Sequence, residues 1–235
     1  MNKSINMSVN KSVNENMGKD IDKSNNKNMN NGDVINRLDV VRKYNPHLNN
    51  IDAKSPLTVG NGRFCFTADV TGMQTLYDEY SEETPLCTMA EWAWHTYPGH
   101  RYTMDDVCMT EYDFLGRKVS YPRVKYEGNE AAYDWVRMNP HKFNLARIAL
   151  SVDGTYLTSD MLSDINQTLD ITTGVLKSDF IVIYASHEYK VSVETVCDNK
   201  SDTVAFRVES ELLKKGLCVD THFPYASCDI TGSDW

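Results

Sequence analysis

The stretch that decides the fold runs from residue 175 to residue 208 and reads VLKSDFIVIYASHEYKVSVETVCDNKSDTVAFRV. In its second half, apolar and polar side chains alternate at every second position. The apolar members of this alternation are Tyr189, Val191, Val193, Val204, Phe206 and Val208. A period of two is typical of a β-strand with one buried face, because successive side chains point to opposite faces. The stretch therefore predicts consecutive strands, beginning with one over 175–184.

Similar patterns occur before and after this stretch. Phe64, Phe66, Ala68 and Val70 fall on one face of a predicted strand. Further strands are expected over 145–150, 167–171 and 217–221, with turns at glycine-containing pairs such as Asp153-Gly154. Strands at this spacing, joined by short turns, indicate an antiparallel sandwich rather than βαβ units. The predicted fold class is mainly β, an antiparallel β-supersandwich with one or two short helices.

Two regions depart from the strand pattern. Residues 130–138 predict a short helix that ends at Asn139-Pro140, because a residue before proline avoids the helical conformation. Residues 79–127 carry aromatic residues, prolines and charges without clear periodicity. A stretch this long suggests a loop that covers a site or docks on a neighbouring domain.

The first 33 residues differ in composition from the rest of the chain. Ten of the first 32 are Asn, and none is aromatic. Such a segment cannot bury enough apolar area to offset its ordering entropy, so residues 1–33 are expected to be a disordered Asn-rich tail. Residues 34–235 are then one β-sandwich domain.

Charge and composition exclude several classes of protein. The net charge is −9, with 24 Lys and Arg against 33 Asp and Glu, which argues against a nucleic-acid partner. Neither a signal peptide nor a membrane-spanning run is recognisable, so a cytoplasmic protein without a membrane partner is expected. None of the six cysteines forms a C-x-x-C pair, and they are interpreted as reduced core residues.

Motifs for catalysis or metal binding are not recognisable in the sequence. Nucleophile elbows, zincin motifs and phosphate-binding glycine loops are missing, and no two histidines stand at helical ligand spacing. Carboxylates are plentiful, but sequence distance does not show which pair could flank a glycosidic bond. Asp164 and Asp170 are interpreted as turn or cap residues. No catalytic residue, metal ligand or cofactor is therefore assigned.

The densest unusual cluster is Glu91-Trp92-Ala93-Trp94-His95. Aromatic rings stack on the apolar faces of pyranose rings, and polar neighbours bond the hydroxyl groups. In extended geometry Trp92 and Trp94 would share a face and form a flat platform. Trp92, Trp94 and His95 are thus the candidate substrate-binding residues, with carbohydrate as the partner. The alternative is that both tryptophans pack into the sandwich or against another domain.

Several separated blocks together resemble the opening of bacterial proteins similar to glycoside hydrolase family 65. The blocks include Ser55 to Gly62, Phe64 to Gly72, Trp92 to His95, Asn139 to His141, Asp164 to Asp170, Val193 to Cys197 and Phe223 to Tyr225. The resemblance covers roughly residues 34–235. It implies an enzyme of the six-hairpin glycosidase type, in which an amino-terminal β-supersandwich precedes an (α/α)6 barrel that carries the catalytic Glu.

The resemblance leads to three hypotheses. In the first, the chain is the non-catalytic sandwich of a glycoside hydrolase or glycoside phosphorylase, truncated before the barrel that is its partner. In the second, it is a free-standing carbohydrate-binding module. In the third, it is a structural or oligomerisation domain without sugar contact.

Overall fold

The computed structural model describes residues 35–98, 101–107, 109–122, 125, 127–228 and 232–235. The chain divides into two compact units, residues 1–40 and residues 41–235. The described part of the first unit is residues 35–40, where helix α2 (Arg37–Arg42) begins. The predicted disordered tail, residues 1–33, lies outside the described residues.

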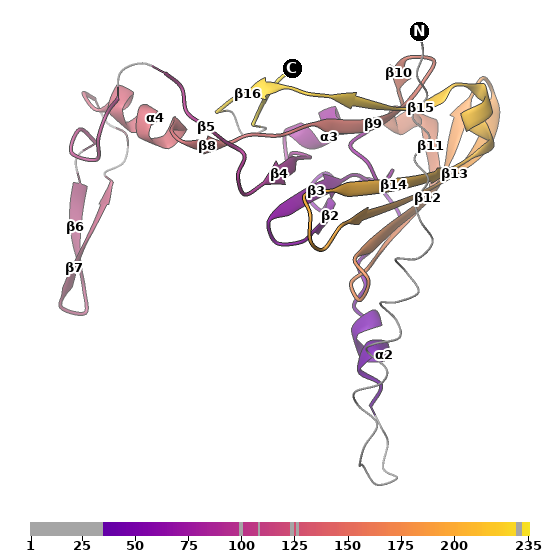
Figure 1. Cartoon of the computed structure of the whole chain (residues 1–235), viewed down its shortest axis with the longest axis horizontal. Helices are drawn as coiled ribbons and strands as arrows, with labels where there is room; N and C mark the ends of the chain where they lie inside the picture. The colour runs from indigo at the N-terminus through magenta and orange to yellow at the C-terminus, as the bar shows by residue number, and fades with distance from the viewer. Residues whose placement is uncertain (1–34, 99–100, 108, 123–124, 126, 229–231) are drawn as a thin grey trace. The chain divides into compact units, whose positions relative to one another are not determined.

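The second unit is built mainly from antiparallel strands (Figure 1). The strands are β1 (His47–Leu48), β2 (Leu57–Gly60), β3 (Phe64–Ala68), β4 (Thr88–Ala90), β5 (Trp94–His95), β6 (Met109–Phe114), β7 (Arg117–Pro122), β8 (His141–Lys142), β9 (Arg147–Val152), β10 (Thr155–Tyr156), β11 (Leu162–Asp170), β12 (Val175–Tyr184), β13 (His187–Cys197), β14 (Val204–Glu209), β15 (Leu217–His222), β16 (Tyr225–Ala226) and β17 (Ser233–Asp234). The helices are α3 (Tyr77–Ser81), α4 (Glu130–Met138) and the short 3-10 helices η1 (Ser159–Met161) and η2 (Glu211–Lys215).

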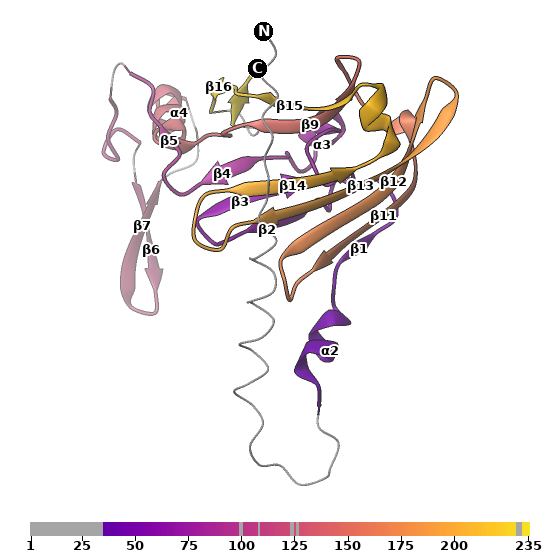
Figure 2. The same cartoon turned by 45° about the vertical axis from the view of Figure 1, so that its right-hand side comes forward.

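The largest sheet has the strand order β1-β11-β12-β13-β14. Figure 2 shows β11 to β14 running side by side as successive antiparallel neighbours. Along β13, Val191 and Val193 are buried, whereas the intervening positions are at least partly exposed. This confirms the strands expected from the alternation over 175–208. The turn at Asp153-Gly154 is also as predicted, with a φ of 78° at Gly154 that suits glycine.

The inner face of this sheet packs against two three-stranded sheets, β10-β9-β15 and β2-β3-β4. Leu150 and Val152 of β9 share one core cluster with Phe180 of β12. Phe66 of β3 shares another with Leu176 of β12, and its ring lies 5.1 Å from that of Phe206. The two layers therefore bury their alternating apolar positions against each other, and the mainly β, antiparallel sandwich fold is confirmed.

Residues 69–76 form a buried connection rather than the end of a strand. Both oxygens of Asp69 accept hydrogen bonds, one from the Thr71 amide at 2.7 Å and the other from the Leu76 amide at 2.6 Å. The Gln167 side chain on β11 donates to the Asp69 carbonyl at 2.7 Å and to Ser178 Oγ at 2.8 Å. A buried backbone needs such partners, and this network supplies them between the layers.

The region from 79 to 127 contains more regular structure than its sequence indicated. It holds β4, β5 and the hairpin of β6 and β7, where the sequence suggested one long loop. In the hairpin, both faces of β6 are largely exposed, so its sequence does not need to alternate between apolar and polar residues. By contrast, the helix expected over 130–138 is confirmed as α4, with Ala132 buried.

Candidate functional site

Trp92 and Trp94 lie directly after β4, beside the sheet β2-β3-β4. Residues 91 and 92 form a turn, and the Trp94 amide donates to the Trp92 carbonyl at 2.9 Å. The flat platform required an extended segment across the two tryptophans. The turn shows that this predicted geometry was wrong. Trp92 is 60% exposed and Trp94 is 53% exposed, while Ala93 between them is fully buried. The backbone thus buries the small residue and leaves both indole rings at the surface.

Each indole ring is held by a polar group from another part of the fold. Trp92 Nε1 donates to Asp202 Oδ2 at 2.7 Å, from the loop between β13 and β14. The Lys142 ammonium of β8 lies 4.5 Å from the Trp94 ring centroid, within cation–π range. Lys142 also donates to the carbonyls of Ala90 at 2.6 Å and Glu91 at 2.5 Å. These contacts restrict the orientation of two exposed aromatic side chains.

An open groove of about 320 Å³ lies next to the tryptophans. Its lining consists of Gly60, Gly62, Arg63, Phe64, Cys65, Met89, Ala90, Glu91 and Lys142. Arg63 Nε donates to Glu91 Oε1 at 2.7 Å, so these two charges are paired at the groove. Position 60 in this lining requires glycine, since a Cβ there would lie 2.6 Å from the Phe64 carbonyl oxygen.

His95 points to a different environment from the two tryptophans. Its strand β5 pairs with β8, which places His95 directly opposite His141. Its ring centroid lies 5.0 Å from that of His141 and 4.9 Å from that of Tyr97. His95 is half-buried in this aromatic cluster, whereas the tryptophans are exposed. The structure therefore separates His95 from the exposed aromatic surface with which the sequence grouped it.

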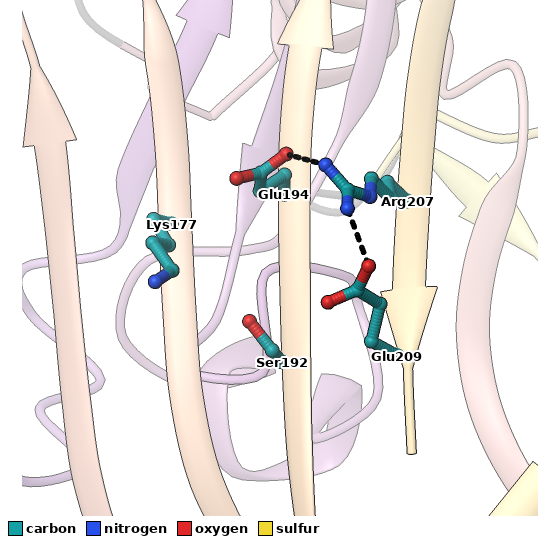
Figure 3. Close-up of a pocket in the computed structure, with 5 residues that line it drawn as sticks. All are labelled: Lys177, Ser192, Glu194, Arg207 and Glu209. Carbon is teal, nitrogen blue, oxygen red and sulfur yellow. Dashed lines mark hydrogen bonds and ion pairs between the residues drawn. The ribbon is translucent and has the colours of Figure 1, made fainter. Parts of the chain in front are cut away.

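A second, smaller pocket of about 60 Å³ lies on the outer face of the five-stranded sheet. It is lined by Lys177, Ser192, Glu194, Arg207 and Glu209 (Figure 3). Figure 3 shows Arg207 between the two carboxylates, with its guanidinium 3.5 Å from Glu194 and also paired with Glu209. Lys177 pairs with Asp179 at 3.2 Å. These are exposed ion pairs between neighbouring strand positions, and we assign the pocket no function.

Asp69 and Asp170 both accept hydrogen bonds within the fold. Burial raises the pKa of Asp69 to about 6, although hydrogen bonds from Thr71 and Leu76 oppose the shift. Asp69 is enclosed by the core and does not face either pocket. Asp170 accepts from the Thr172 hydroxyl at 2.6 Å, which lowers the pKa of Asp170. Asp170 begins the turn after β11, since its carbonyl accepts from the amides of Thr173 and Gly174, which confirms it as a turn residue. Asp164 lies inside β11, at an irregularity with a φ of 49°, so its interpretation as a turn or cap residue was wrong.

Cys65, Cys197, Cys218 and Cys228 are free thiols, as the sequence analysis expected for reduced cysteines. Cys65, Cys87 and Cys197 are half-buried, and burial raises the pKa of both Cys87 and Cys197 to about 11. Cys218 and Cys228 are exposed, so their assignment to the core was wrong. Cys108 lies outside the described residues.

Among the described residues, no group of three or more His, Cys, Asp or Glu side chains is arranged to hold a metal ion. The described helices include none with the length and apolar character needed to cross a bilayer.

Comparisons with protein-family models, with curated proteins and with solved structures found no match to this chain.

Proposed function

We propose that this chain is the non-catalytic amino-terminal β-sandwich of a carbohydrate-active enzyme that acts on glycosidic bonds. In this proposal, the exposed surface of Trp92 and Trp94, together with the adjacent groove, contacts carbohydrate. The catalytic Glu belongs to an (α/α)6 barrel outside the chain, and the protein acts in the cytoplasm. The resemblance of residues 34–235 to proteins similar to glycoside hydrolase family 65 motivates the enzyme class.

The proposal depends mainly on one observation, namely that the Trp92 ring is both exposed and held in a fixed orientation. Its ring is 60% exposed, yet its nitrogen is fixed by Asp202. An exposed aromatic ring held in one orientation loses little side-chain entropy when a sugar ring stacks on it. The neighbouring groove adds paired polar groups, Arg63 and Glu91, which can exchange hydrogen bonds with hydroxyl groups.

Trp92→Ala tests this proposal by isothermal titration calorimetry with maltose and maltotriose. We expect saturable heat with the native chain and a loss of at least about tenfold in affinity in the variant, because stacking on the ring is removed. Phe223→Ala is the matched control, since Phe223 is 79% exposed and belongs to neither the tryptophan surface nor the groove. If Trp92→Ala and Phe223→Ala bind the sugars with the same affinity, the sugar contacts another surface. Heat that remains absent at millimolar sugar would reject carbohydrate contact.

A docking role is the second candidate, because exposed indole rings also suit an interface with another protein domain. The alternative in which both tryptophans pack into the sandwich is excluded by their exposure. The nucleotide sequence that follows the Trp235 codon separates the remaining hypotheses. A helix-rich reading frame of several hundred codons supports the enzyme-fragment proposal. A natural stop codon in an undisrupted gene would instead favour a free-standing module.

A further inference from the structure

Two histidines that are far apart in the sequence meet where β5 pairs with β8. His95 and His141 are direct cross-strand partners, and their ring centroids lie 5.0 Å apart. Each ring retains one buried nitrogen without a hydrogen-bond partner, Nδ1 of His95 and Nε2 of His141. Buried polar atoms are normally satisfied, so two adjacent exceptions require a physical explanation.

The His141 ring is already oriented in the way that metal-binding imidazoles usually are. Its Nδ1 lies 2.6 Å from the Met138 carbonyl oxygen, which can only accept a hydrogen bond. Nδ1 therefore carries the proton of the neutral ring, and Nε2 keeps its lone pair. A second-shell carbonyl of this kind fixes the tautomer and raises the basicity of the nitrogen that ligates a metal.

We propose that His95 and His141 bind one divalent transition-metal ion, of which zinc is the representative. A tetrahedral ion with Zn–N bonds of about 2.0–2.1 Å holds two imidazole centroids roughly 5 Å apart. The observed separation of 5.0 Å fits this arrangement. Imidazole nitrogen is a preferred ligand of Zn²⁺, Ni²⁺ and Cu²⁺.

The surroundings define what kind of metal site this would be. Tyr97 packs against both rings at 4.9 and 5.4 Å, but its hydroxyl donates to the Ala226 carbonyl at 3.4 Å. Lys142 follows His141 on the same strand, and its ammonium is held by Trp94 and two carbonyls. With two protein ligands among the described residues, the remaining positions are left to water or to another small ligand. Two protein ligands at a buried position should give moderate affinity.

The test is calorimetric titration of the untagged, metal-free full chain with zinc sulfate at pH 7.5. We expect one ion per chain, and a loss of at least about tenfold in affinity in both His95→Gln and His141→Gln. His187→Gln is the matched control, because His187 is an exposed histidine on β13 and should leave zinc affinity unchanged. The absence of saturable binding, or equal binding by all three variants, would overturn the proposal.

A second measurement uses the native chain, so its result does not depend on whether the variants fold. Nitrogen-15 spectra of the imidazole rings should show zinc-dependent shifts of His95 Nδ1 and His141 Nε2, with His187 unchanged. Zinc-saturated protein in which those two resonances do not move would place the ion elsewhere and reject the assignment. Neither measurement depends on sugar binding, so this proposal can fail while the proposed function stands.

Discussion

Trp92 exposes most of its indole ring while Asp202 holds the ring nitrogen. Because the ring contributes little to the core, Trp92→Ala should lower the free energy of unfolding by less than about 1 kcal/mol. Phe66→Ala removes a fully buried ring and should cost about 3–5 kcal/mol. Urea denaturation of the two variants provides the comparison. A loss of several kcal/mol in Trp92→Ala would mean that the ring is part of the core.

Asp69 is a buried carboxyl, and its ionisation should change the free energy of unfolding with pH. Its pKa is raised from 3.8 to about 6 by burial, so between these values the folded state binds more protons than the unfolded chain. The contribution of Asp69 is therefore present in full below about pH 4 and is lost as the pH rises through about 6. The expected loss is about 3 kcal/mol.

Denaturation of the native chain and of Asp69→Asn across pH 4–7 measures this contribution. Asn cannot accept a hydrogen bond from the Leu76 amide through its nitrogen, so the variant is expected to be less stable at pH 4. Because Asn does not titrate, the contribution of Asp69 is the difference between the two proteins in how the free energy of unfolding changes with pH. If the unfolding free energies of the two proteins run parallel across this range, Asp69 titrates normally in the fold.

At the scale of elements, Arg147 joins β9 to the buried connection of residues 69–76. Its guanidinium donates to the carbonyls of Gln74 at 3.1 Å and Thr75 at 2.8 Å, and lies 4.3 Å from the Tyr156 ring centroid. Arg207, in contrast, makes exposed ion pairs on the outer face of the large sheet.

Arg147→Met should therefore lower the free energy of unfolding by about 1.5–3 kcal/mol, because hydrogen bonds from a charged group are lost. Arg207→Met should change it by less than about 1 kcal/mol, as is usual for exposed ion pairs. Thermal or urea denaturation of both variants at the same pH gives the comparison. Equal losses would show that the contacts of Arg147 with residues 69–76 do not stabilise the fold.

The β6–β7 hairpin differs in stability from the central strands. Its strands pair with each other, and Tyr112, Phe114 and Tyr121 are all more than half exposed. A two-stranded hairpin with little burial is marginally stable in water. Amide hydrogen exchange in β6 and β7 should therefore be much faster than in β12 and β13, which lie inside a five-stranded sheet. Equal protection would indicate that the hairpin is covered by a partner.

For the whole molecule, strands with one buried face could be predicted from the sequence. Val191 and Val193 alternate with polar neighbours because one layer covers their face, and the structure confirms that strand. The β6–β7 hairpin could not be predicted in this way, because burial does not impose alternation on it. Local patterns thus identify elements that form the core and miss elements that lie at the surface.

The candidate site was only partly predictable for a related reason. The residue types at Trp92 and Trp94 indicated an aromatic surface, but the two rings are held by contacts with Asp202 and Lys142, which are far away in the sequence. The opposition of His95 and His141 depends on the pairing of β5 with β8. No local signal reports such a long-range pairing, so the histidine pair became apparent only in the structure.

The central claim is that the surface at Trp92 contacts carbohydrate, and the indole resonances of the full chain test it most directly. The four tryptophans give four Nε1–H signals, and that of Trp92 is bonded to Asp202. Titration with maltotriose should shift the Trp92 signal in a saturable way and leave the signal of Trp135, on α4, unchanged. A Trp92 signal that stays fixed at millimolar maltotriose, or that moves no more than the Trp135 signal, would contradict the account.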